Sequence, residues 1–79
     1  MTTYQIRMAL AVLGIESSVT DEVIKFRTTV TTIKMSVVRK HTYYQYHTLT
    51  RAFMVSGVLT VTFISDEQFI QFITEKFKK

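Results

Sequence analysis

Hydrophobic residues near the start of the chain recur at the spacing of an amphipathic helix. The stripe comprises Ile6, Ala9, Leu10 and Leu13. Thr2 and Gln5 fit a capping box, in which a hydroxyl and an amide satisfy free backbone donors of the first helical turn. Gly14 follows at a position where a left-handed C-terminal cap is favoured. The pattern predicts a core helix from about Tyr4 to Leu13.

A second apolar stripe lies near the other end of the sequence. It consists of Phe69, Ile70, Phe72, Ile73 and Phe77. Ser65 and Gln68 fit another capping box, and Asp66 and Glu67 stand in the first turn, where the helix dipole favours negative charge. We therefore expect a second helix after Ser65, with its apolar stripe packed into the same core.

Between these two helices the pattern is that of strands. From Val23 to Ile64 the chain is rich in threonine, valine, isoleucine, tyrosine and phenylalanine, which are the residues that favour a pleated sheet. Hydrophobic residues alternate in one phase up to Val30 and in the opposite phase from Ile33, which indicates a bulge or a turn near Thr31. With a bulge there, one outer face would carry Lys25, Arg27, Lys34 and Lys40.

Turn residues are scarce in this central region. No Gly, Pro, Asn or Asp occurs between Glu22 and Ser56, so a few long strands are expected rather than several short hairpins. Ser56 and Gly57 offer a tight turn, and we expect another turn near Arg39 to Thr42. The predicted fold is α+β, in the order α-β-β-β-α, with an antiparallel sheet and both helices on one face, in a single domain over residues 1–79.

The same segment is also compatible with a winged helix-turn-helix. Hydrophobic residues at helical spacing in it are Val23, Phe26, Val30, Ile33 and Val37. Asp21–Thr28 and Thr32–His41 would then form the two helices, with a wing over residues 53–63. Lys25 stands where such motifs favour a small residue, Thr29 replaces the usual turn glycine, and helix propensity between the two helices is poor. We therefore rank this fold second.

The length and the absence of cysteine limit how the chain can be stabilised. A chain of 79 residues has room for one domain and buries only roughly 60% of its unfolded surface. Disulfides and thiolate metal sites are excluded, which leaves self-association as the expected source of extra stability. We expect a cytoplasmic homo-oligomer, with a dimer favoured, and no membrane-spanning segment.

Charged residues are segregated along the chain, which has a net charge of +4. The acidic residues lie toward the ends, and every charged residue between Glu22 and Asp66 is basic. These basic residues are Lys25, Arg27, Lys34, Arg39, Lys40 and Arg51. A sheet built from this segment should carry a positive surface that attracts phosphates or an acidic protein.

Tyrosines accompany these cations and suggest the kind of ligand. Basic side chains neutralise phosphates, and exposed tyrosines can stack on unpaired bases. The sequence thus predicts a non-enzymatic accessory or regulatory protein that binds nucleic acid, with RNA slightly favoured over DNA. The residues expected at the interface are Lys25, Arg27, Lys34, Arg39, Lys40, Arg51, Tyr43, Tyr44 and Tyr46.

Two other functions remain open at this stage. A protein-interaction module, for example a viral inhibitor, could dock on an acidic partner through the same positive surface. His41, His47 and Lys40 could in principle serve a metal-free ribonuclease. A metal site would lack further ligands near the two histidines, and no other catalytic arrangement can be recognised, so we expect neither a cofactor nor enzymatic activity.

Overall fold

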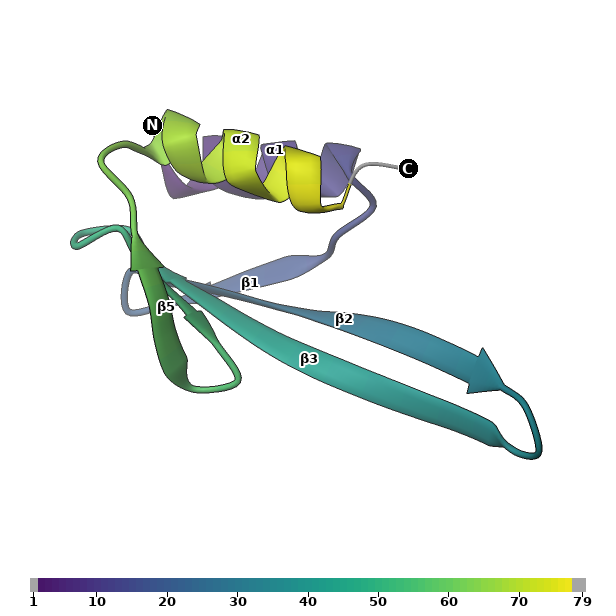
Figure 1. Cartoon of the computed structure of the whole chain (residues 1–79). Helices are drawn as coiled ribbons and strands as arrows, with labels where there is room; N and C mark the ends of the chain where they lie inside the picture. Colours follow the sequence, from purple (N-terminus) through teal and green to yellow (C-terminus); the bar gives the residue numbers. More distant parts are fainter. Residues whose placement is uncertain (1, 78–79) are drawn as a thin grey trace.

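The computed structural model describes residues 2–77 and shows two helices on one face of a five-stranded antiparallel sheet (Figure 1). The elements in chain order are α1 (Thr3–Val12), β1 (Ser17–Thr20), β2 (Val23–Ile33), β3 (Val37–His47), β4 (Ala52–Val55), β5 (Val58–Thr62) and α2 (Asp66–Lys76). Neighbouring strands in the sheet are also neighbours in the sequence. The predicted α+β class, the antiparallel sheet and the placement of both helices on one face are confirmed.

Both helices begin with the caps that the sequence predicts. At α1, Thr2 N donates to Gln5 Oε1 over 2.9 Å, and Gln5 N donates to Thr2 Oγ1 over 3.2 Å. At α2, Gln68 N donates to Ser65 Oγ over 3.2 Å. The Gln68 amide oxygen, however, accepts from Ile64 N over 2.7 Å, one residue before the cap, so the second capping box is completed through the preceding residue.

Gly14 ends α1 in the left-handed conformation, with φ of 80°. Gly14 N donates to Ala11 O over 2.9 Å and Ile15 N donates to Leu10 O over 3.0 Å, which is the paired hydrogen bonding of a Schellman motif. Ile15 is buried in the same core as Leu10. The cap thereby directs the chain from the helix layer down to β1.

The core lies between the two helices and the inner face of the sheet, by which we mean the face that the helices cover. Its buried residues are Ile6, Leu10, Ile15, Ile24, Phe26, Tyr44, Tyr46, Phe53, Phe63, Phe69 and Ile73. The Tyr46 and Phe69 rings are stacked with their centroids 3.8 Å apart. Aromatic contacts of this kind hold α2 against β3 and β4.

Two hairpin turns use backbone conformations with positive φ at both central residues. In the β1–β2 turn, φ is 52° at Asp21 and 65° at Glu22, and in the β4–β5 turn it is 52° at Ser56 and 80° at Gly57. Turns with these signs match the right-handed twist of the flanking strands. The turn predicted at Ser56 and Gly57 is confirmed.

The β2–β3 hairpin extends well past the helices (Figure 1). Its turn is formed by Lys34, Met35 and Ser36, so the turn predicted near Arg39 to Thr42 is wrong. Every residue from 29 to 41 is exposed, and we call this segment the arm. The molecule is consequently elongated, measuring 44 Å along its longest axis against 25 and 20 Å along the others.

The change of hydrophobic phase near Thr31 predicted a bulge or a turn at that place, and the structure has neither there. Residues 23–33 pair with residues 47–37 in one continuous register. Val30 therefore lies on the inner face and Ile33 on the opposite face of the same strand. The helices cover neither side of the arm, so the hydrophobic residues there are not confined to the face of the strand that lines the core.

Three further expectations are corrected. The short strand β1 was not predicted, because Ser17–Thr20 offers little hydrophobic alternation. The turn over residues 48–51 divides what was expected to be one strand into β3 and β4. The helix-turn-helix alternative is wrong, since the segment proposed for its helices forms β2 and the arm.

Candidate nucleic-acid interface

The sheet surface opposite the helices, which we call the outer face, begins at the base of the arm. Phe26 and Tyr44 point into the core, so Lys25, Arg27 and Tyr43 point to the outer side, because side chains alternate along a strand. Arg27 lies directly opposite Tyr43 in the register. Two cations and an exposed aromatic ring are thus brought together at this place.

The arm adds cations on both of its faces and at its end. Arg39 lies opposite Thr31 on the outer face, whereas Lys40 lies opposite Val30 on the inner face. Lys34 stands in the turn, where Lys34 N donates to Ser36 O over 3.5 Å. The predicted common face for Lys25, Arg27, Lys34 and Lys40 is therefore wrong, because it required a bulge that does not occur. The result is a ribbon that carries positive charge on each side and no acidic residue.

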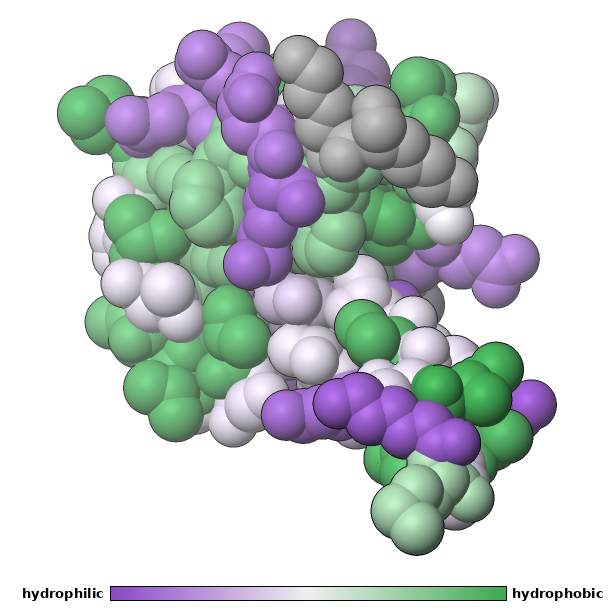
Figure 2. All heavy atoms as spheres, turned by 45° about the vertical axis from the view of Figure 1, so that its right-hand side comes forward, coloured by the Kyte–Doolittle hydropathy of each residue, from purple (hydrophilic) through white to green (hydrophobic). Residues whose placement is uncertain are grey.

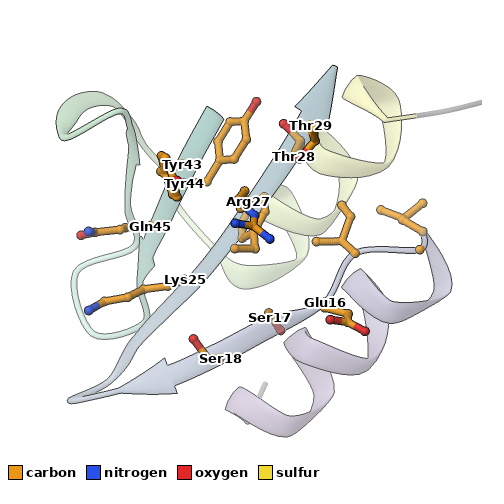
Figure 3. Close-up of a pocket in the computed structure, with 14 residues that line it drawn as sticks. Glu16, Ser17, Ser18, Lys25, Arg27, Thr28, Thr29, Tyr43, Tyr44 and Gln45 are labelled. Atoms are coloured by element: carbon orange, nitrogen blue, oxygen red, sulfur yellow. The ribbon is translucent and has the colours of Figure 1, made fainter. Parts of the chain in front are cut away.

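An open groove of about 830 Å³ lies beside the base of the arm. It runs between the α1–β1 connection and strands β2 and β3. Arg27 lies over its middle, with Lys25 and Gln45 on one side and Glu16 on the other (Figure 3). The groove therefore offers one carboxylate and two cations to a molecule that enters it.

The three predicted tyrosines are separated by the fold. The exposed fraction is 57% for Tyr43, 6% for Tyr44 and 0% for Tyr46. The Tyr46 hydroxyl donates to Asp66 Oδ1 over 2.6 Å, and burial, followed by this bond, raises the pKa of Tyr46 above its ordinary value. Tyr44 and Tyr46 belong to the core, which leaves Tyr43 as the predicted tyrosine that a ligand can reach.

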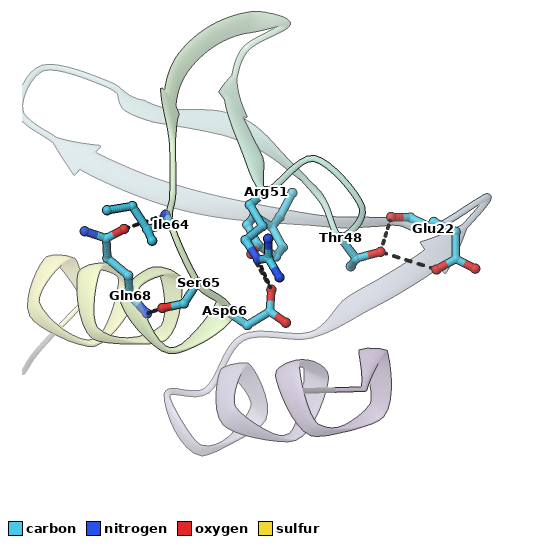
Figure 4. A network of polar contacts seen from close by, with 8 residues as sticks. Glu22, Thr48, Arg51, Ile64, Ser65, Asp66 and Gln68 are labelled. Atoms are coloured by element: carbon cyan, nitrogen blue, oxygen red, sulfur yellow. Dashed lines mark hydrogen bonds and ion pairs between the residues drawn. The ribbon is translucent and has the colours of Figure 1, made fainter.

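Arg51 also lies apart from the arm. Its Nε atom is 3.8 Å from Asp66 Oδ1 (Figure 4), and Asp66, the first residue of α2, is itself buried. The carboxylate that follows the helix cap thus compensates the Arg51 charge. This contact joins the β3–β4 turn to α2. The sequence did not reveal it, because Arg51 was assigned to phosphate binding and Asp66 to the helix dipole.

The two histidines do not form a catalytic pair. Both lie on the outer face of β3, six residues apart, which corresponds to about 20 Å along a strand. His41 Nδ1 is 2.9 Å from Thr29 Oγ1, and Lys40 points to the opposite face. Among residues 2–77 no group of three or more His, Cys, Asp or Glu side chains is placed to hold a metal ion.

Exposed apolar side chains are the feature of the arm that the sequence did not reveal. The residues are Val30, Ile33, Met35, Val37 and Val38, with exposed fractions from 55% to 102%. Figure 2 shows hydrophobic and hydrophilic side chains next to each other on this projecting end. From the sequence, such residues are naturally assigned to a core, because alternation does not tell whether a layer covers the strand.

No protein-family model, curated protein or solved structure matches this chain. Neither helix in the described part of the chain has the length and hydrophobicity that crossing a membrane requires.

Proposed function

We propose that this protein binds nucleic acid and that the arm is its recognition element. The observation that carries the proposal is that the arm is fully exposed and that all its charges are positive. It adds no buried side chain to the core, so its length and charge are explained by contact with another molecule. Lys25 and Arg27 continue the positive surface from the arm onto the outer face.

The shape of the arm favours duplex DNA as the ligand. The major groove of B-DNA is about 12 Å wide and admits a two-stranded β-ribbon. The major groove of A-form RNA is too narrow for protein side chains to read. The expected preference for RNA depended on base stacking by three tyrosines, of which Tyr44 and Tyr46 are buried. We therefore place DNA before RNA.

Within this proposal the basic residues have different positions on the ligand. Lys40 and Arg39 project from opposite faces of the ribbon, so they can reach the phosphates of the two strands that border a groove. Lys34 lies at the end of the arm. Lys25 and Arg27, at its base, would contact the backbone outside the groove and set the orientation of the domain.

The experiment is a titration of a fluorescent DNA duplex at several salt concentrations, followed by anisotropy. Arg39→Ala and Lys40→Ala should each weaken binding and reduce the slope of log K against log salt by about one unit. Lys76→Ala is the matched control, because it removes an exposed cation from α2, away from the arm. Equal effects of all three substitutions would show that binding responds only to net charge and would reject the assignment to the arm.

A second candidate function is a protein-interaction module, and the exposed apolar residues of the arm favour it. The two candidates differ in what remains bound after purification. We would compare absorbance at 260 and 280 nm with and without nuclease and high-salt washing. Nucleic acid that salt removes supports the first candidate, whereas a clean protein that retains one stoichiometric protein partner through the salt wash supports the second.

A further inference from the structure

The arm has two strand edges that pair with nothing in the described part of the chain, and they differ in character. β1 covers β2 only from Val23 to Phe26, so the edge of β2 is free over residues 27–33. β4 covers β3 from Tyr44 onward, so the opposite edge is free over residues 37–42. Each free edge presents unsatisfied backbone donors and acceptors.

The β3 edge carries most of the usual protection against pairing. Proteins guard exposed edges with charged side chains, prolines or bulges. The β3 edge contains Arg39, Lys40 and His41. The free β2 edge has one charge, Arg27 at its start, and residues 28–33 read Thr-Thr-Val-Thr-Thr-Ile, without a charge or a proline. The register of β2 with β3 also shows no bulge. The β2 edge therefore has the composition of a strand that pairs.

We infer that this β2 edge pairs with the β2 edge of a second copy of the chain, antiparallel and about a two-fold axis. The register that uses the whole free edge places Val30 opposite Val30 of the second copy. Arg27 then lies opposite Ile33 of the second copy, and by symmetry this pair occurs twice. No like charges face each other in this register, so the edge is complementary to itself.

The end of the arm and the groove beside its base support the same register. β1 stops at Ser17, opposite Phe26, and in the proposed dimer the turn of the second copy arrives at this place. The groove there has Glu16 on one wall and Leu13 and Ile15 among its lining residues. Lys34 of the second copy would face Glu16, which forms no ion pair with another described residue. Met35, the most exposed hydrophobic residue described, would contact the apolar wall.

This inference does not depend on the proposed function, because the edges and the groove carry it without any nucleic acid. In the dimer the two sheets form one continuous sheet, and the outer faces of both copies lie on the same side. Each copy would then present Lys25 and Arg27 on a shared surface. All tests below are made without nucleic acid, so their failure leaves the DNA titration unaffected.

The first test is disulfide cross-linking at the two-fold axis. The chain contains no cysteine, so Val30→Cys introduces a single thiol. Val38→Cys is the matched control, because Val38 is similarly exposed, at 55% against 61%, and lies on the other strand of the arm. On mild oxidation the Val30→Cys protein should form a covalent dimer and the Val38→Cys protein should stay largely monomeric. Equal cross-linking of the two proteins, or none in either, overturns the inference.

The second test measures self-association by sedimentation equilibrium. In Val30→Glu, each new carboxylate faces Lys40 of its own chain, which preserves the hairpin, but the two carboxylates oppose each other across the axis. The dimer dissociation constant should rise at least about tenfold. Val38→Glu, which faces Thr32 in its own chain, should leave it nearly unchanged. A wild-type protein that stays monomeric, or a Val30→Glu protein that dimerises normally while circular dichroism shows a folded chain, overturns the inference.

The third test is a charge exchange between groove and arm. Glu16→Lys and Lys34→Glu should each weaken the dimer, and the double variant should recover most of the loss, because the ion pair is restored with reversed polarity. The same sedimentation measurement gives the result. Additive weakening in the double variant would overturn the placement of the arm end in the groove.

Discussion

At the scale of single residues, the contact among Tyr46, Asp66 and Arg51 is a polar link between the sheet and α2. A hydrogen bond to a charged group contributes about 1.5–3 kcal/mol, and here the acceptor is the buried carboxylate of Asp66, 2.6 Å from the Tyr46 hydroxyl. We predict that Tyr46→Phe lowers the unfolding free energy by about 1–3 kcal/mol in urea denaturation. Tyr43→Phe, at an exposed ring, should change it by less than about 0.5 kcal/mol, and a similar loss in both would contradict the assignment.

The raised pKa of Tyr46 gives this contact a pH dependence. The folded state favours the neutral hydroxyl more than the unfolded state does, so the contribution is complete below the ordinary tyrosine pKa of about 10. It is lost progressively as the pH rises above that value. The difference in unfolding free energy between wild type and Tyr46→Phe should therefore stay constant from about pH 7 to about pH 9 and shrink from about pH 10 to about pH 11. A difference that stays constant up to about pH 11 would show that the pKa of Tyr46 is the same in the folded and unfolded states.

Backbone conformation at the hairpin turns gives a second prediction at this scale. Glu22 has φ of 65°, which is unfavourable for a residue with a side chain, so Glu22→Gly should stabilise the protein by about 0.5–1 kcal/mol. The Glu22 carbonyl keeps its hydrogen bonds from Thr48 N over 3.0 Å and from Thr48 Oγ1 over 2.9 Å, and only the exposed 3.3 Å bond from Thr48 Oγ1 to the Glu22 carboxylate is lost. Gly57→Ala should destabilise by about 1 kcal/mol, although a Cβ there meets no atom within 4 Å. In thermal unfolding, the midpoint should rise for Glu22→Gly and fall for Gly57→Ala.

At the scale of elements, the arm should be separable from the domain that carries it. Thr28 and Thr42 face each other at its base, so a two-residue Asn-Gly turn can join them in place of residues 29–41. Because no removed residue is buried, the unfolding free energy at low protein concentration should change by less than about 1 kcal/mol. Binding to duplex DNA should be lost. A shortened protein that is unfolded, or that binds DNA as the full chain does, contradicts this view of the arm.

The elements that the sequence predicts well are those with local signals. Both helices carry their caps and stripes within a few residues, and Ser56-Gly57 marks its own turn. The turn of the arm has only a weak signal, because Ser36 is a common turn residue but no Gly, Pro, Asn or Asp stands beside it. Its position follows instead from the pairing of β2 with β3, which is a long-range property.

The candidate site was predictable in its charge and only partly in its geometry. The strand pattern places Lys25 and Arg27 on the same face correctly, since that pair depends only on alternation. Burial of Tyr44 and Tyr46 depends on where the helices lie above β3, and the Arg51 contact depends on α2 returning to the sheet. Neither can be read from local spacing.

At the scale of the whole molecule, the proposed dimer links stability to concentration. A partner that binds only the folded state adds about 2.7 kcal/mol when its concentration is about a hundred times the dissociation constant. The thermal midpoint of the wild-type protein should therefore rise with protein concentration. The protein with the shortened arm lacks the β2 edge and should have a midpoint that does not change with concentration. Calorimetry at several concentrations compares the two, and a constant wild-type midpoint would mean that the 79-residue chain is stable through its own core alone.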